Sequence, residues 1–262
     1  MRGLIVAAAI FAAGATTVQA ADLAARPYTK APTPAVVPIT NWTGFYIGGH
    51  IGYGWGRTTW TDPAINNFFG APGLEYGNYR PDGILGGGQI GLNYQIDRLV
   101  LGIEGEYSAA DIKGSESRVV AFTGPFPWVT ANRLESIAAV TGKIGYAFDS
   151  WLPYFKGGAA WARDKQSLAS GIPAPPNPLF GEITNTRSGW TIGAGLEYAL
   201  SANWSVKAEY DYYDFGRKTL TMSVNSPSTT GLSDHITEET LHVVKVGVNY
   251  RFNWAQPVIA KY

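Results

Sequence analysis

One stretch near the end of the chain decides the fold: Leu241-His242-Val243-Val244-Lys245-Val246-Gly247-Val248-Asn249-Tyr250-Arg251-Phe252. From Val244 onward every even position is apolar, whereas Lys245 and Arg251 occupy odd positions. A repeat of two residues is typical of a β-strand whose two faces differ. An apolar face opposite a charged face fits the wall of a barrel that separates lipid from a polar interior.

The composition also indicates many short strands. The 262 residues include 32 glycines, 9 tryptophans, 15 tyrosines and 11 phenylalanines, a combination that suits a barrel wall. Charged residues make up 15% of the chain and the formal net charge is zero, so nothing electrostatic indicates a nucleic-acid partner. Cysteine is absent, which excludes disulfides, thiolate metal sites and cysteine nucleophiles.

The N-terminus has the pattern of an export signal. Met1-Arg2 precedes an apolar run, Leu4 to Ala13, and Val18-Gln19-Ala20 has the form of a cleavage site. A membrane anchor is the alternative, but the run is about half the roughly 20 apolar residues that a spanning helix needs. We therefore expect residues 1–20 to be a cleaved signal peptide and the protein to be exported.

Alternating segments between residues 43 and 252 predict the barrel. Residues 21–42 contain four prolines and predict an extended periplasmic segment before it. Residues 253–262 include Pro257, which disfavours a further strand, and predict a short periplasmic tail. The eight predicted strands run from Thr43 to Trp55, Gly83 to Ile96, Leu99 to Asp111, about Asn132 to Phe148, Leu152 to Ala162, Arg187 to Leu200, Trp204 to Tyr213 and Leu241 to Phe252.

The connections alternate between tight turns and long segments. The long ones are about Gly56 to Asp82, Ile112 to Ala131, Arg163 to Thr186 and Asp214 to Glu238. This alternation is typical of outer-membrane barrels. We predict an all-β, eight-stranded antiparallel up-and-down transmembrane β-barrel with short periplasmic turns and four long extracellular loops.

Aromatic residues on the predicted apolar faces fall into two bands, as lipid interfaces require. A secreted soluble β-domain, the alternative, has no need of two bands. The band near the short turns contains Phe45, Tyr94, Phe148, Phe155, Tyr198, Trp204, Tyr250 and Phe252. The band near the long connections contains Tyr53, Trp55, Tyr107, Trp161, Trp190 and Tyr212.

The opposite faces carry charges of both signs, which predicts a charge network in the lumen. Its predicted members are Glu104, Glu106, Arg133, Glu135, Lys143, Lys156, Arg187, Glu197, Lys207, Glu209, Asp211, Lys245 and Arg251. Side chains largely fill an eight-stranded barrel, so these charges pair or stay hydrated. The network is interpreted either as a salt-bridged plug or as a narrow hydrated path for small solutes.

Motifs for chemistry are weak. Gly86-Gly87-Gly88-Gln89-Ile90-Gly91 matches the glycine spacing of dinucleotide-binding loops, but it lies within an alternating strand with no helix after it. His242 faces outward near the outer rim, where a lipid A deacylase would need a serine beside it, yet position 244 is valine. His50 is expected in the lumen and Glu238-Glu239 on a solvated rim. We expect no catalytic, cofactor-binding or metal site, and no enzyme.

The chain resembles the OmpA-like or opacity-type small outer-membrane barrels, known as outer membrane immunogenic or porin-family proteins of rhizobial and related Gram-negative bacteria. The resemblance rests on the start Trp42-Thr43-Gly44-Phe45-Tyr46-Ile47-Gly48-Gly49, the end Gly247 to Phe252, and the segments Trp151 to Tyr154 and Asn203 to Tyr210. It implies a cell outer-membrane protein surrounded by lipid and lipopolysaccharide. It also implies periplasmic chaperones and the barrel assembly machinery as partners during biogenesis.

The resemblance implies a structural surface role in envelope integrity. The alternatives are a weak porin for small solutes, and an adhesin or immune-facing protein that contacts a host or surface ligand through its loops. We expect Tyr250 and Phe252 to form the assembly signal, because Phe252 ends the apolar alternation, although Tyr262 is the terminal aromatic residue.

Overall fold

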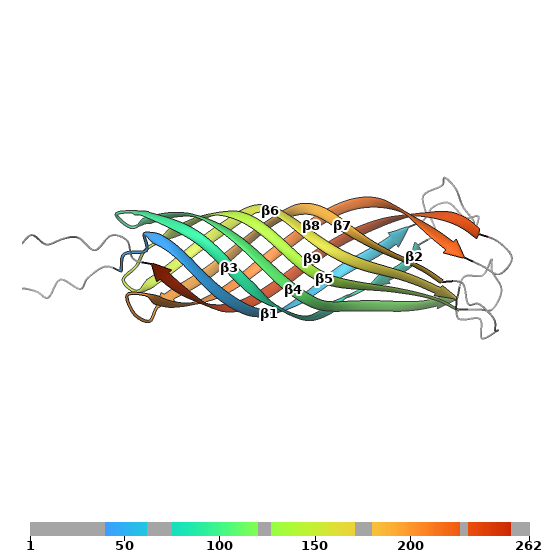
Figure 1. Cartoon of the computed structure of the whole chain (residues 1–262), viewed down its shortest axis with the longest axis horizontal. Coiled ribbons are helices and arrows are strands. Elements are labelled where there is room, and N and C mark those ends of the chain that lie inside the picture. The colour runs from blue at the N-terminus through green and yellow to red at the C-terminus, as the bar shows by residue number, and fades with distance from the viewer. Residues whose placement is uncertain (1–39, 62–74, 120–126, 171–179, 226–229, 253–262) are drawn as a thin grey trace, which may run out of the picture. The chain divides into compact units, whose positions relative to one another are not determined.

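The chain folds into an antiparallel β-sheet that closes on itself (Figure 1). The computed structural model describes residues 40–61, 75–119, 127–170, 180–225 and 230–252. These residues belong to one compact unit, Pro38–Tyr262. Within the described ranges, no helix is both long enough and apolar enough to cross a membrane.

Nine strands lie in the described ranges, and each pairs antiparallel with its neighbours in the sheet order β2-β1-β3-β4-β5-β6-β7-β8-β9. Their bounds are β1 Gly44–Thr61, β2 Glu75–Tyr79, β3 Asp82–Ile96, β4 Leu99–Val119, β5 Pro127–Tyr146, β6 Trp151–Ser170, β7 Phe180–Ala199, β8 Trp204–Asn225 and β9 Thr230–Phe252.

Strands β1 and β9 close the ring. Their register continues without a shift from the pair Phe45 and Phe252 to the pair Thr61 and Ile236. Neither strand therefore leaves an unpaired backbone edge, which lipid could not satisfy. The predicted antiparallel barrel, closed between its first and last strands, is confirmed.

The structure has one strand more than predicted because Arg80 and Pro81 interrupt the wall. Thr58 of β1 pairs with Tyr79 of β2, and Trp55 of β1 pairs with Asp82 of β3. Proline has no N–H to donate to a neighbouring strand. Strand β2 therefore continues the line of β3 along β1, and eight positions around the ring are filled by nine strands.

The strands are much longer at one end than the sequence predicts. Strands β8 and β9 contain 22 and 23 residues, about twice the 9 to 11 residues that a tilted strand needs to span a bilayer. The loop bounds predicted from the sequence were therefore wrong, because much of each predicted loop is paired strand. The parts that remain, 62–74, 120–126, 171–179 and 226–229, lie outside the described residues.

These strand extensions carry polar residues on both faces and only scattered apolar ones, such as Trp60 and Phe215, so they lack the regular apolar alternation that a sequence search detects. β-branched threonines favour strands, and Thr219, Thr221, Thr237 and Thr240 lie in the extended parts of β8 and β9. We call this end of the barrel the long-connection end. The other is the short-turn end, where Asp97 and Asp149 adopt the left-handed φ angles of 53° and 50° that suit tight turns.

The wall between the two ends exposes large apolar side chains. Ile51 and Phe155 are each 68% exposed, and the exposed set includes residues on all eight long strands. Such a continuous apolar exterior is unfavourable in water and is the surface that lipid covers. The interior is consequently the polar side of this sheet.

Candidate functional site: the layered barrel interior

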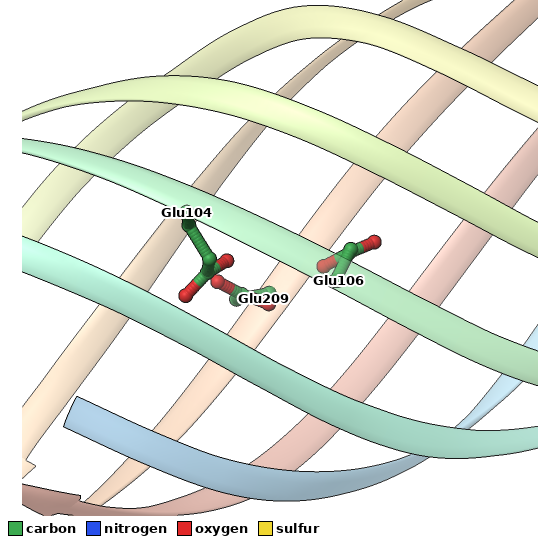
Figure 2. Close-up of side chains that lie close together, drawn as sticks. All are labelled: Glu104, Glu106 and Glu209. Carbon is green, nitrogen blue, oxygen red and sulfur yellow. The ribbon is translucent and has the colours of Figure 1, made fainter.

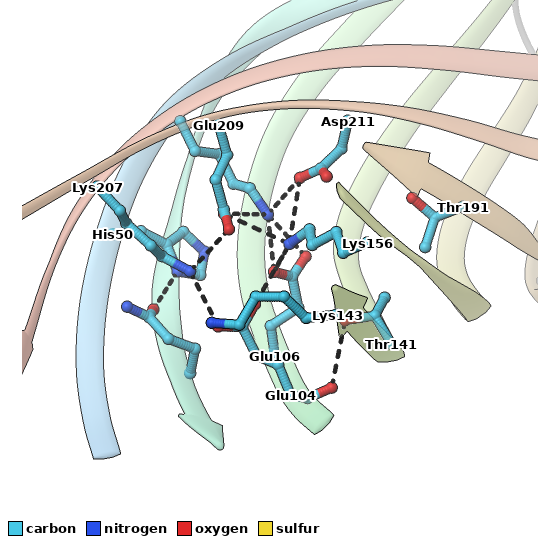
Figure 3. A network of polar contacts seen from close by, with 12 residues as sticks. His50, Glu104, Glu106, Thr141, Lys143, Lys156, Thr191, Lys207, Glu209 and Asp211 are labelled. Atoms are coloured by element: carbon cyan, nitrogen blue, oxygen red, sulfur yellow. Dashed lines mark hydrogen bonds and ion pairs between the residues drawn. The ribbon is translucent and has the colours of Figure 1, made fainter. Parts of the chain in front are cut away.

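Nine charged side chains meet in the barrel interior, and we call them the central charge cluster. They are Glu104 and Glu106 on β4, Lys143 on β5, Lys156 on β6, Glu197 on β7, Lys207, Glu209 and Asp211 on β8, and Lys245 on β9. All are buried. Alternation along each strand directs these positions inward, and Figure 3 shows most of them converging from opposite walls.

Two lysines connect the carboxylates of the cluster. Lys156 Nζ lies 3.1 Å from Glu106 and 3.4 Å from Glu209. Lys245 Nζ lies 2.7 Å from Glu106 and 2.7 Å from Asp211. Because each lysine contacts carboxylates from different strands, the cluster ties opposite walls of the barrel together.

Tyrosine hydroxyls donate hydrogen bonds to these carboxylates in place of water. The donated hydrogen bonds are Tyr46 to Glu104 at 2.8 Å, Tyr154 to Glu209 at 2.5 Å and Tyr213 to Glu106 at 2.8 Å. Buried carboxylates need such partners in addition to the lysines. The cluster is therefore paired and hydrogen-bonded.

Glu104, Glu106 and Glu209 bring carboxylate oxygens within 4.8 Å of one another, close enough to hold a metal ion (Figure 2). However, Lys207 Nζ lies 3.1 Å from both Glu104 and Glu209, and Lys156 lies 3.1 Å from Glu106. Lysine ammonium groups thus occupy the positions where a cation would bind. This arrangement fits a salt-bridged core better than a metal site.

A serine and a histidine, Ser108 and His50, form a hydrogen bond in the barrel interior. His50 Nε2 lies 2.7 Å from Ser108 Oγ, and His50 Nδ1 lies 2.7 Å from Gln89 Oε1. The pair has the spacing of a nucleophile and its base. Ser108 is 2% exposed and His50 is 5% exposed, so the protein covers both side chains almost entirely.

Two predicted members of the charge network do not lie in the interior. Arg133 pairs with Asp111 at 2.9 Å and Glu135 with Arg163 at 3.5 Å, all with partly exposed side chains. The prediction that they face inward was wrong because β5 shifts register between Leu134 and Ser136. Beyond this β-bulge the even positions of β5 face inward instead of the odd ones, so Leu134 is buried.

Arg187 belongs to a second group, nearer the long-connection end. It lies 3.3 Å from Asp164 and 3.7 Å from Glu239; we call these three buried residues the upper polar cluster. Each is three residues beyond a residue of the outer aromatic band or its neighbour His242, so the cluster is beyond the lipid-facing part of the wall. Burial raises the pKa of Glu239 to about 7, although Arg187 opposes this shift.

Asp164 and Glu239 were not predicted as interior residues. Asp164 was assigned to a loop and Glu239 to a solvated rim, yet they are 0% and 2% exposed. The neighbouring Glu238 does lie outside, paired with Arg217. Continued period-two spacing from Lys156 to Asp164 was the available signal, since both positions are even.

An apolar layer separates the two polar clusters. Its buried members include Leu85, Ile112, Leu134, Ile137, Tyr213, Phe215, Leu241 and Val243. They come from five strands, β3, β4, β5, β8 and β9. Buried apolar side chains at this level offer few polar groups along which an ion could pass.

Trp42 closes the short-turn end, although it belongs to the segment predicted to precede the barrel. It is 0% exposed and packs with Val100 and Leu152. Its backbone N–H donates to Gln95 Oε1 at 2.7 Å, and the Arg251 guanidinium lies 4.3 Å from its ring centre. Arg251 is thus part of this closure and lies away from the central charge cluster.

The glycines near the start of the barrel permit close backbone packing. Gly44 has a φ of 140°, which lets the chain turn from Trp42 into β1. A Cβ at Gly87 would overlap the carbonyl oxygen of Tyr107. The glycine string around Gly87 therefore serves the packing of β3 on β4.

The fourteen predicted girdle residues lie on the outer wall, exposed or half-exposed. His242 joins the outer band: it stacks on Trp55 with ring centres 5.8 Å apart, and its Nδ1 lies 2.7 Å from the Tyr210 hydroxyl. Among the described residues, no serine contacts His242 through a hydrogen bond. His242 is thus a polar member of an aromatic interface band.

Residues 5–252 match the family model described as outer membrane protein beta-barrel domain. The chain therefore belongs to this family of outer-membrane β-barrel proteins, and its place is the outer membrane.

Within that family, the chain is 32% identical to the 31 kDa outer-membrane immunogenic protein of Brucella melitensis, over 95% of this chain and 99% of the relative. It is 27% identical to the 25 kDa outer-membrane immunogenic protein of Brucella abortus, over 95% and 97%.

Solved structures with a similar course of the chain include OprG from Pseudomonas aeruginosa, with 14% identity and a TM-score of 0.46 over 80% of this chain and 96% of that one. Ail of Yersinia pestis has 13% identity and a TM-score of 0.38 over 80% and 99%.

Proposed function

We propose that this outer-membrane barrel is a structural surface protein of the envelope that neither conducts solutes nor catalyses a reaction. The observation that carries the proposal is the succession of layers in its interior: the Trp42 closure, the central charge cluster, the apolar layer and the upper polar cluster. Each layer consists of buried side chains from several strands. Such an interior supports a rigid wall and offers little room for transport.

The central charge cluster supports a structural role on energetic grounds. Removing one partner of a buried ion pair typically costs about 3 to 5 kcal/mol, because the other charge is left uncompensated. A hydrated pore would instead keep its charges exposed to water. The paired charges are suited to fixing the relative positions of the six strands that carry them.

Single-channel recording tests this proposal. The signal-free protein, refolded and inserted in a planar bilayer, is expected to give no current steps, while a known porin in the same bilayer conducts. The double variant Leu241→Ala, Val243→Ala removes side-chain volume from the apolar layer only. It is also expected to give no current steps, because the salt bridges of the central charge cluster are unchanged. Current steps in the wild-type protein would overturn the proposal and favour the weak porin.

The Ser108 and His50 pair is the place to test catalysis. Because both are buried, we expect no labelling of the folded protein by a fluorophosphonate probe, which reacts with activated serines. Heat-denatured protein provides the background. Labelling of the folded wild type that disappears in Ser108→Ala would contradict the non-enzymatic role.

An adhesin role is the second candidate, and the long strand extensions favour it. Strands β8 and β9 continue well beyond the outer aromatic band, so they present a rigid surface outside the lipid. Replacement of residues 226–229 or 171–179 by short glycine linkers should leave folding intact. Loss of host-cell binding in these variants would favour adhesion; unchanged binding would exclude these loops.

Export and assembly stay predictions from the sequence. Residues 1–20 and 253–262 lie outside the described residues, so signal cleavage and the role of the tail rest on their sequence patterns. We infer that Phe252, which packs 4.9 Å from Tyr250 between ring centres, completes the signal read by the barrel assembly machinery. Normal insertion of Phe252→Ala, with loss of insertion on deleting Tyr262, would reverse this assignment.

A further inference from the structure

A row of three cations crosses the outer wall beyond the outer aromatic band. Lys113 of β4 pairs in register with Arg133 of β5, and Arg133 pairs with Lys165 of β6. All three side chains are partly exposed, at 57%, 52% and 39%. Neighbouring strands are about 4.8 Å apart, so the row presents its charges side by side.

The β-bulge in β5 creates this row. Below the bulge the odd positions Ile137 and Lys143 point inward, and beyond it the even position Asn132 is the inward one. Without this reversal Arg133 would point into the barrel and the row would contain two lysines only. Bulges often re-aim a side chain at a functional position.

The row lines a hollow of about 400 Å³ in the outer wall. Small residues form its floor between the cations, among them Gly114, Ala131 and Ser167. Side chains of this size leave space above the sheet, so a compact anion can approach Arg133 from outside. Arg133 can bind a phosphate through two parallel hydrogen bonds, which makes arginine well suited to this ligand.

Two carboxylates flank the row and leave it with one excess positive charge. Asp111 lies 2.8 Å from Lys113 and 2.9 Å from Arg133, and Glu182 lies 2.8 Å from Lys165. Exposed pairs of this kind are worth little. They orient the cations and yet exchange readily for a stronger partner.

The height of the row matches the polar surface of the bilayer. Lys165 follows Trp161, a residue of the outer aromatic band, by four positions on β6. Four residues correspond to roughly 13 Å along the strand, or about 9 Å of height for a strand tilted by about 45°. Aromatic bands lie at the headgroup level, so the row is at the level of the phosphates and first sugars of an outer-leaflet glycolipid.

We infer that Lys113, Arg133 and Lys165 bind a phosphate group of a phosphorylated glycolipid in the outer leaflet, of the lipopolysaccharide type. The inference rests on the proposed function only in taking the barrel to stand in the outer membrane with its long-connection end outward. A lipid bound along β4 to β6 would fix the protein in the leaflet. The site lies outside the lumen, so it is independent of whether the barrel conducts.

Binding measurements on the full, refolded protein in detergent test the site. The probes are lipopolysaccharide, the same lipopolysaccharide after enzymatic dephosphorylation, and inorganic phosphate. We expect the triple variant Lys113→Gln, Arg133→Gln, Lys165→Gln to bind lipopolysaccharide at least about tenfold more weakly, since each charge-assisted contact contributes substantially. Dephosphorylation should weaken wild-type binding to a similar extent.

The control is Arg57→Gln, Arg217→Gln, which removes two exposed cations from β1 and β8 elsewhere on the wall. It should bind lipopolysaccharide as the wild type does, within about twofold. Equal affinities of wild type and triple variant would overturn the inference, as would equal affinity for intact and dephosphorylated lipid. Inorganic phosphate bound as tightly as the lipid would assign the site to a free anion instead.

Discussion

The two polar clusters of the interior differ in how completely their buried charges are paired. The central charge cluster has five carboxylates and four lysine ammonium groups, and lipid covers the wall around it. The upper polar cluster has two carboxylates and one guanidinium, and it lies beyond the outer aromatic band. The difference indicates that dense pairing is needed where water is excluded from both sides of the wall, whereas one titratable group is tolerated nearer to water.

Among the variants that test this comparison, Lys156→Met should lower the stability of the protein most. Lys156 lies within 4 Å of Glu104, Glu106, Glu209 and Asp211, and methionine keeps much of its volume while removing the charge. We expect the free energy of unfolding to fall by about 3 to 5 kcal/mol, measured by urea titration in detergent with tryptophan fluorescence.

The matched control is Lys165→Met, on the same strand but on the outer wall. Its side chain is 39% exposed and forms an ion pair with Glu182, so the loss should stay below about 1 kcal/mol. Similar losses for the two variants would mean that the central charge cluster has no special weight in stability.

Val246→Arg tests where the lipid-covered wall ends. Val246 is 52% exposed on β9 and lies beside Ile51 of β1, so an arginine there should cost about 2 to 4 kcal/mol in a bilayer. Thr59→Arg lies beyond the aromatic band, opposite Glu238, and should change stability by no more than about 1 kcal/mol. Folding titrations in lipid vesicles give both values; equal costs would place the lipid boundary elsewhere.

The sequence predicts the central region well because lipid demands a strict pattern. From Val244 to Phe252 every even position is apolar, and these residues lie on the outer face of β9. Beyond the aromatic band both faces can be polar, so apolar alternation does not indicate that Asp164 points inward, and its even spacing from Lys156 is the remaining signal. The prediction failed there for that physical reason.

Sequence spacing also could not reveal the bulge near Glu135. The even positions from Leu134 to Phe148 form an unbroken alternation in the sequence, because a small residue such as Ser136 is compatible with the apolar face. Register against β4 and β6 decides the matter, because Leu134 pairs with both Ile112 and Asp164, which face inward. Such cross-strand constraints are not contained in one strand's own sequence.

Glu239→Gln distinguishes the upper polar cluster by its response to pH. In the wild type the pKa of Glu239 rises from 4.5 to about 7 on folding, so the folded state holds its proton more tightly. The free energy of unfolding should therefore fall by roughly 3 kcal/mol as pH rises from about 4.5 to 7 and then level off. Glutamine has no proton to lose, so the variant should lack this decline.

The adjacent Glu238 provides the control, because it is on the outer face and pairs with Arg217. Glu238→Gln should retain the wild-type decline between pH 4.5 and 7. Urea titrations at pH 5 and pH 8 suffice for the comparison. A decline that persists in Glu239→Gln would assign it to another group.

Arg163→Gln should change the free energy of unfolding least, because it removes a charge on the exposed outer wall. Arg163 pairs with Glu135 at 3.5 Å and its side chain is 61% exposed, one position along β6 from the buried Asp164. Water and salt screen this pair, so its loss should change the free energy of unfolding by about 0.5 kcal/mol or less, and by nothing measurable in 1 M salt. A loss that approaches that of Lys156→Met would show that the outer wall also relies on its ion pairs. The small value expected here follows from the same rule as the large one at Lys156: the contribution of a charge to stability depends on how completely water is removed from it and on whether its partner can be hydrated when left alone.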